Sequence, residues 1–205
     1  MKSIIKDVAI LFAITLVSGF MLGLVYEATK DRIAQAELEA KLAAYEEICS
    51  EAETFEETAQ LTTDMNAFNE SLLVAGFGEF GNVIIDEVVC AKDTEGNVLA
   101  YLVTATSSEA YDGTLQVMTG VSVEGEVLGI TYLSLTETPG LGLKAQEDKF
   151  KNQYAGKTVE SFTVVKTGAT ADNEIDAISG ATKTSKAVTG CVNAALAFAA
   201  EYSAE

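Results

Sequence analysis

The chain has 205 residues, which is enough for one compact domain and additional segments. Its 31 acidic side chains outnumber the 13 basic ones and give a formal net charge of −18, which argues against nucleic-acid binding, because that function needs a basic face. There is no histidine, and the three cysteines, Cys49, Cys90 and Cys191, show no C-x-x-C spacing, so histidine-based catalysis is excluded and a zinc or iron–sulfur cluster is disfavoured.

The first predicted element is a membrane-spanning helix over residues 8–26, which are nineteen residues without a charge. A helix of this length matches a hydrocarbon thickness of about 30 Å. Charged residues follow directly at 27–32 where a signal peptide would have a small-residue cleavage site, so we expect an uncleaved single-pass anchor. The weak excess of lysine before the span places residues 1–7 in the cytoplasm and the main domain outside the cell or inner membrane.

The helical pattern continues beyond this anchor to about Glu53. Apolar side chains repeat on one face, at Leu38, Leu42, Tyr45 and Cys49. We interpret residues 27–55 as a stalk helix whose lower half packs on a domain formed by residues 56–205. Residues 55–80 within this region are only weakly patterned.

Two β-hairpins are predicted next, from runs rich in β-branched residues. Their strands are residues 83–91, 98–106, 115–123 and 127–135. The runs are separated by turn-forming residues at 92–97 and 124–126. Neighbouring hairpins indicate an antiparallel sheet, and helices expected at 144–154 and 183–202 would cover one face. The fold class is therefore α+β. A single transmembrane helix and a stalk precede the antiparallel sheet in the sequence.

A turn motif with the only proline of the chain ends the second hairpin. It reads Glu137-Thr138-Pro139-Gly140-Leu141-Gly142, and we call it the Pro-Gly turn. Its proline and first glycine favour a chain reversal, and Gly142 would let the backbone approach a ligand closely. On these residues alone, the motif is either a strand-ending turn or part of a binding site.

A run of small and hydroxyl-bearing residues precedes the last predicted helix. It reads Asp176-Ala177-Ile178-Ser179-Gly180-Ala181-Thr182, followed by Thr184 and Ser185, and we call residues 176–182 the hydroxyl loop. Free backbone N–H groups and the dipole at a helix start favour an anion, so this loop is a candidate phosphate site. The alternative is a cluster of serine and threonine residues that caps the helix.

Together the two motifs resemble the signatures of the FMN-binding proteins of membrane electron-transport complexes, above all the G subunit of the Rnf complex. Its relative is the C subunit of the Na+-translocating NADH:quinone reductase. In that family a flavin transferase links FMN through its phosphate to the last threonine of Asp-x-x-Ser-Gly-Ala-Thr, here Thr182. The resemblance spans the chain and implies that FMN contacts these residues: Asp176, Ser179, Gly180, Ala181, Thr182, Thr184, Glu137, Thr138, Gly140, Leu141 and Gly142.

Three similar-looking motifs are rejected. Thr167-Gly-Ala-Thr170 lacks the acid three residues before it, because that position is Val164. Ala155-Gly-Lys-Thr158 lacks the leading glycine of a phosphate-binding P-loop, because residue 151 is lysine. Gly76-Phe-Gly78 has no strand and helix around it and is expected to be a loop.

The resemblance implies an electron-carrying subunit rather than an enzyme acting alone, with no catalytic residues and no metal. The whole complex would move electrons between ferredoxin and NAD, coupled to Na+ or H+ transport. Expected partners are the other membrane subunits, lipid, and the flavin transferase during maturation. Three alternatives stay open: the C subunit of the quinone reductase, a cofactor-free binding module outside the cytoplasm, and a stand-alone flavin reductase component.

Overall fold

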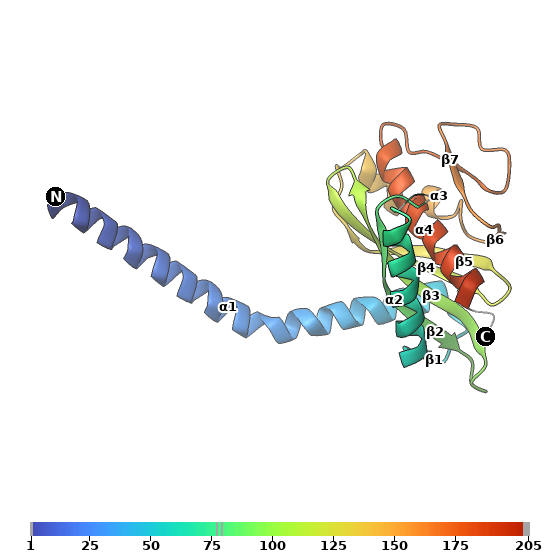
Figure 1. Ribbon diagram of the computed structural model, residues 1–205, viewed down its shortest axis with the longest axis horizontal. Coiled ribbons are helices and arrows are strands. Elements are labelled where there is room, and N and C mark those ends of the chain that lie inside the picture. Colours follow the sequence, from blue (N-terminus) through green and yellow to red (C-terminus); the bar gives the residue numbers. More distant parts are fainter. Residues whose placement is uncertain (1, 77, 79, 203–205) are drawn as a thin grey trace. The chain divides into compact units, whose positions relative to one another are not determined.

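The computed structural model describes residues 2–76, 78 and 80–202 (Figure 1). Met1 of the expected cytoplasmic segment, Phe77 of the Gly76–Gly78 run and the last three residues of the expected domain lie outside these described residues. The chain divides into two compact units at the boundary between Leu42 and Ala43.

Helix α1 (Lys2–Ile48) accounts for nearly all of the first unit. Within the described residues it is the one helix long and apolar enough to cross a membrane, with an 18-residue window of mean hydropathy 2.5 in which no residue is buried. The helix ends at Ile48 and not near Glu53, so the expected extent of the stalk helix was wrong. The chain leaves the helix here to join a sheet: the Glu53 amide donates to Lys92 O (2.8 Å), and Thr54–Glu56 forms strand β1.

The second unit is built on an antiparallel sheet of six strands in the order β1 to β6. After β1, the strands are β2 (Val83–Lys92), β3 (Val98–Ala110), β4 (Gly113–Ser122), β5 (Glu126–Leu135) and β6 (Lys157–Thr158). The α+β class and the four long strands are as predicted. The two expected hairpins are parts of one meander, because β3 runs to Ala110 and only Tyr111 and Asp112 separate it from β4.

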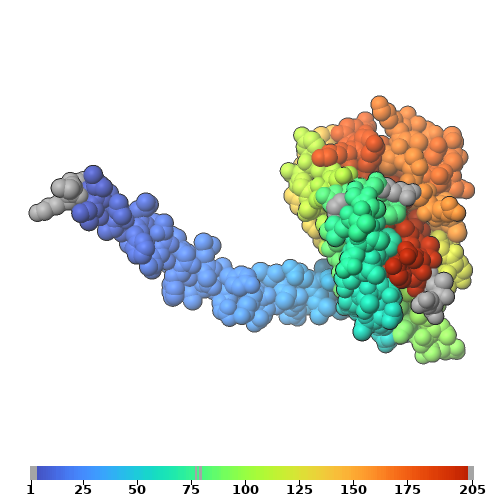
Figure 2. All heavy atoms as spheres, in the orientation of Figure 1, coloured from blue at the N-terminus to red at the C-terminus, as the bar shows by residue number. Residues whose placement is uncertain are grey.

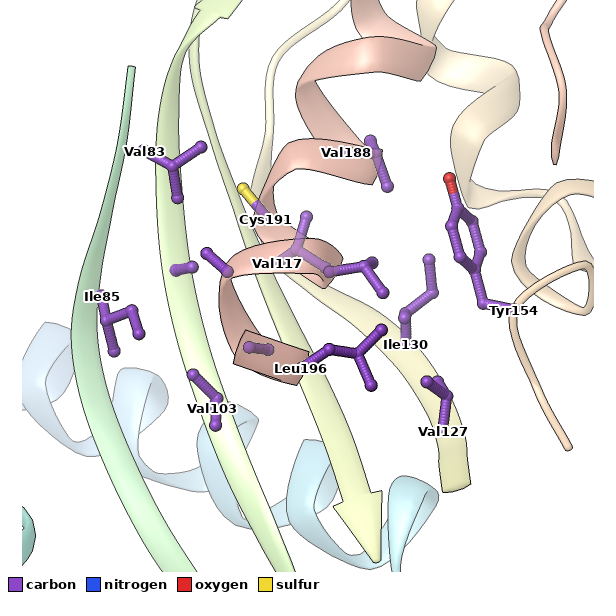
Figure 3. Close-up of a cluster of buried hydrophobic side chains, with 14 of the residues drawn as sticks. Val83, Ile85, Val103, Val117, Val127, Ile130, Tyr154, Val188, Cys191 and Leu196 are labelled. Carbon is purple, nitrogen blue, oxygen red and sulfur yellow. The ribbon is translucent and has the colours of Figure 1, made fainter. Parts of the chain in front are cut away.

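Helices α2 (Ala59–Val74) and α4 (Thr182–Tyr202) cover one face of this sheet. They pack on each other through Phe68 and Phe198, whose rings meet edge to face with centroids 5.7 Å apart. Figure 2 shows α2 in teal beside the end of α4 in red. In Figure 3, side chains of β2 to β5 point toward Val188, Cys191 and Leu196 of α4, and together they form the main hydrophobic core.

The opposite face of the sheet is covered by the last turns of α1, within the second unit. Ala44, Tyr45 and Cys49 are buried there against Leu102 and Met118. Of the four residues on the predicted apolar face of the stalk, the two nearest the sheet are therefore buried, while the other two stay exposed.

The helix predicted over residues 144–154 was wrong in its form. The structure has a 3-10 helix, η1 (Gly142–Gln146), and one turn of α-helix, α3 (Asp148–Lys151). Glu147 between them has an extended backbone (φ −70°, ψ 139°), which breaks the helical path. The break lets Phe150 and the fully buried Tyr154 pack edge to face, with ring centroids 5.7 Å apart.

A small parallel pair of strands, β7 (Thr163–Val165) and β8 (Glu174–Asp176), leads into α4. Neither strand was predicted, because each has only three residues and shows no alternation long enough to detect. Their pairing places the hydroxyl loop at the end of β8, directly before the first turn of α4.

Candidate functional site

The Pro-Gly turn and the hydroxyl loop meet at one cavity of about 260 Å3. It is lined by Tyr111, Glu137, Thr138, Leu141, Gly142, Gly180, Ala181, Lys183 and Thr184. The β3–β4 turn, the end of β5 and the start of α4 thus converge, although these segments are far apart in the sequence (Figure 1). Seven of the eleven residues expected from the family resemblance line this cavity.

The Pro-Gly turn is closed by its own backbone. Thr138 O accepts hydrogen bonds from the amides of Leu141 (3.1 Å) and Leu143 (3.3 Å). Gly140 has φ +78°, a left-handed conformation that side chains disfavour, and nothing lies near its missing side chain. The reversal places Leu141 over Gly180, where an added Cβ atom would lie 3.0 Å from Leu141 Cδ2.

The hydroxyl loop is held by Ser185 from the first turn of α4. Its Oγ accepts from the Ile178 amide (2.9 Å) and donates to Ala181 O (3.0 Å). The Ala181 amide donates to Ile178 O (2.8 Å), so the loop forms a tight turn with Gly180 at φ +79°. Thr182 is consequently the first residue of α4.

The hydroxyl groups around this turn differ in accessibility. Thr184 and Ser185 are fully buried, and both hydroxyls are engaged in hydrogen bonds. Thr182 is half-buried and Ser179 is exposed, and neither side chain has a partner within the part of the chain that the structure describes. Thr182 is therefore the free hydroxyl at the helix start.

The first turn of α4 also offers free backbone donors. Among the described residues, the amides of Thr182, Lys183 and Thr184 have no acceptor, whereas the Ser185 amide bonds to Ala181 O (3.0 Å). Unpaired N–H groups at a helix start, together with the helix dipole, favour an anion.

Glu137 joins the segments that form the cavity. Its side chain is 7% exposed, and its Oε1 accepts hydrogen bonds from the Tyr111 amide (2.9 Å) and from the Thr184 hydroxyl (3.0 Å). A Cβ atom at Gly142 would overlap Glu137 Oε2 and would lie 2.8 Å from Thr184 Oγ1. We expected Gly142 to admit a ligand; in the structure it makes room for the Glu137–Thr184 hydrogen bond.

Asp176 and Ser179 lie on the other side of the hydroxyl loop, in a second cavity of about 350 Å3. Asp176 Oδ1 accepts from the Ala169 amide (3.0 Å), and Gln153 bonds to both backbone groups of Asp176. The acid of the motif is thus engaged with the chain itself. Gly140 and Thr182 border neither cavity but are adjacent in sequence to residues that line the first.

Sequence reasoning missed two residues that line the first cavity, Tyr111 and Lys183. Tyr111 is 71% exposed in the β3–β4 turn, where a large aromatic side chain in a two-residue turn was the available signal. Lys183 follows Thr182 directly and gave no separate signal.

A larger cavity of about 610 Å3 lies at the opposite end of α4, between Leu196–Ala200 and the turn that joins β4 to β5. No residue of either motif lines it. The cysteines also provide no reactive group, because all three are buried, and burial raises the pKa of each thiol above its ordinary value.

Comparisons with known proteins identify the family of this chain. Residues 110–197 match the family model of the FMN-binding domain, and residues 1–48 match that of the RnfG N-terminal region. The G subunit of the Na(+)-translocating ferredoxin:NAD(+) oxidoreductase complex of Acetobacterium woodii is 34% identical over 94% of this chain and 89% of its own. The G subunit of the proton-translocating complex of Clostridium ljungdahlii is 41% identical over 50% of this chain and 55% of its own.

The C subunit of the Na(+)-translocating NADH-quinone reductase from Parabacteroides distasonis has a solved structure with a TM-score of 0.48 and 18% identity, covering 73% of this chain and 99% of that one. The two family models and the 34% identity across almost the whole chain decide between the two relatives expected from the motifs. The chain belongs to the RnfG family of the ion-translocating Rnf-type ferredoxin:NAD oxidoreductase complexes, and it carries an FMN-binding domain.

Proposed function

We propose that this protein is a membrane-anchored flavoprotein subunit that relays electrons within an ion-translocating ferredoxin:NAD oxidoreductase complex, with FMN bound covalently to Thr182. The observation that carries the proposal is the meeting of both motifs at one cavity beside a free hydroxyl at a helix start. Family membership supports the complex and its other subunits as partners.

The residues at this site fit a flavin nucleotide. The unpaired amides at the start of α4 suit a phosphate group, and Tyr111 and the 42% exposed Leu141 offer apolar contact to a ring. The cavity of about 260 Å3 is smaller than the roughly 300–1,000 Å3 typical of sites that enclose a small molecule. It would cover only part of FMN, which suits a relay that must exchange electrons with neighbouring subunits.

Bound FMN supplies transfer of one or two electrons, and the protein supplies position and electrostatics. The flavin transferase would supply FMN in an activated form whose phosphate carries a leaving group. The Thr182 hydroxyl would lose its proton and its oxygen would bond to that phosphorus, while the bond from the phosphorus to the leaving group breaks. The phosphate that remains at the first residue of α4 would be stabilised by the helix start. Thr184 and Ser185 are poor acceptors by comparison, because both are fully buried.

The test is peptide mapping and in-gel flavin fluorescence after denaturation, with the protein coexpressed with a flavin transferase. Thr182→Ala should lose all covalent fluorescence and the added mass of one FMN. Thr170→Ala is the matched control, because Thr170 ends a similar Gly-Ala-Thr run but its hydroxyl donates to Glu174 (3.2 Å). Flavin on Thr170, Ser179 or a cysteine would refute the assignment, and a wild-type protein without flavin would favour a cofactor-free module.

We further propose that the protein crosses the membrane once through α1, with residues 1–7 in the cytoplasm and residues 8–26 in the bilayer. The stalk, whose helix ends at Ile48, and the domain that follows it would both lie outside. The apolar window of α1 supports the span, and the acidic composition of the remaining chain supports an exposed domain. Protease added to right-side-out vesicles should digest the domain. Full protection of the domain from protease in sealed vesicles of that orientation would contradict this topology.

A further inference from the structure

Among the described residues, Glu137 is the one buried ionisable side chain at the first cavity, and no ion pair neutralises its charge. It is 7% exposed, and no ion pair to it exists among the described residues. From the part of the chain that the structure describes, two hydrogen bonds reach its carboxylate, both at Oε1. Burying a carboxylate without a cation is costly, and a glutamine of the same shape would accept the same two hydrogen bonds.

We propose that Glu137 is a positioning residue that fixes the flavin pocket and places a negative charge beside bound FMN; this proposal rests on the proposed function. Glu137 is the first residue of the Pro-Gly turn. Its carboxylate accepts hydrogen bonds from the Tyr111 amide in the β3–β4 turn and from the Thr184 hydroxyl in α4. The absence of a side chain at Gly142 permits this contact. Three segments that line the cavity therefore depend on one buried carboxylate.

The fixed charge has a consequence for electron transfer. An electron added to a group beside a fixed negative charge is repelled, and the repulsion is stronger in a partly water-excluded site than in water. Glu137 should therefore lower the reduction potential of the flavin and favour its role as an electron donor to the next carrier. A side chain that only held the fold together would not affect the potential in this charge-dependent way.

The test is a redox titration of the full-length protein carrying covalent FMN. Glu137→Gln keeps the shape and both acceptor contacts, so we expect a wild-type content of covalent FMN and a raised potential. Glu124→Gln is the matched control, because Glu124 is exposed and lies at the larger cavity at the opposite end of α4. The flavin in this variant should have the wild-type reduction potential. An unchanged potential in Glu137→Gln, or loss of covalent FMN from the folded variant, overturns the proposal.

A second pair of variants tests the hydrogen bond between Thr184 and Glu137. Thr184→Val removes the hydroxyl that donates to Glu137, whereas Thr184→Ser retains it. The valine variant should shift the potential, and the serine variant should stay at the wild-type value. Wild-type behaviour of both variants also overturns the proposal. A wild-type protein that carries no covalent FMN contradicts the proposed function itself, and the two failures are thereby distinguished.

Discussion

Ile48, the last residue of α1, packs directly onto the bare Cα atom of Gly120, near the end of β4. A Cβ atom at Gly120 would overlap Ile48 Cγ2 and would lie 3.3 Å from Leu102 Cδ2. The strand is flanked by β3 and β5, so its backbone cannot move away. The missing side chain at Gly120 thus makes room for Ile48 at the end of α1.

Gly120→Ala should lower the free energy of unfolding by about 1–3 kcal/mol, the usual cost of overpacking a well-packed site. Gly129→Ala is the control, because Gly129 pairs with Gly120 across the sheet but has open space at its missing side chain. Urea unfolding of the detergent-solubilised protein, followed by near-ultraviolet circular dichroism, measures the difference. Equal stabilities of the two variants would show that Ile48 adapts without cost.

Two tyrosines with buried hydroxyl groups give a second prediction. The Tyr132 hydroxyl has no hydrogen-bond partner among the described residues, whereas the Tyr154 hydroxyl bonds to Thr189 Oγ1 (2.7 Å). Tyr132→Phe removes an unsatisfied buried group and should leave stability unchanged or raised, while Tyr154→Phe should lose about 1 kcal/mol. The same unfolding measurement applies to both, and a larger loss in Tyr132→Phe would reveal a partner for that hydroxyl.

Much of this fold is predictable because long elements with a regular period carry their own signal. The four long strands and α4 were placed to within a few residues, since β-branched runs and the i, i+3, i+4 spacing of α4 are local properties of the sequence. The helix expected at 144–154 was not placed correctly. The extended backbone of Glu147 interrupts an otherwise helical run, and this interruption allows Phe150 to be buried. Helix α2 was missed although Leu61, Met65, Phe68 and Leu72 recur at helical spacing, because threonine, asparagine and aspartate residues of weak helix propensity interrupt this apolar face.

The candidate site was predictable only in its parts. Each motif could be recognised locally, but the hydrogen bond from Thr184 to Glu137 joins residues 47 positions apart, and no sequence period indicates such a contact. The contact of the Gly142 position with the Glu137 and Thr184 side chains likewise gave no signal in the sequence.

Acid should loosen the loop between β7 and β8 through Glu174. The Thr170 and Ala171 amides donate to its carboxylate and hold its pKa below the ordinary glutamate value. Because the folded pKa is lowered, this contribution to stability is present above the unfolded pKa and is lost as pH falls through the folded one. The NMR shifts of both amides should titrate with a midpoint below the ordinary value, and Glu174→Gln should abolish this titration. A midpoint at or above that value would contradict the contact.

The last prediction concerns a role of Asp176 in the proposed attachment of FMN to Thr182. Its carboxylate accepts a hydrogen bond from the Ala169 amide (3.0 Å), and Gln153 clamps its backbone, so the acid ties the 167–170 segment to the hydroxyl loop. We expect Asp176→Ala to lower covalent flavin strongly, because the loop before Thr182 loses this support. Asp176→Asn still offers an oxygen to the Ala169 amide and should retain most of the flavin.

In-gel flavin fluorescence after coexpression with a flavin transferase measures both variants, and near-ultraviolet circular dichroism confirms that each is folded. The pair separates two roles of the acid, since asparagine preserves the hydrogen bond and removes the charge. An equal loss of flavin in both folded variants would contradict the loop-positioning role. It would indicate instead that the transferase recognises the negative charge of Asp176 directly.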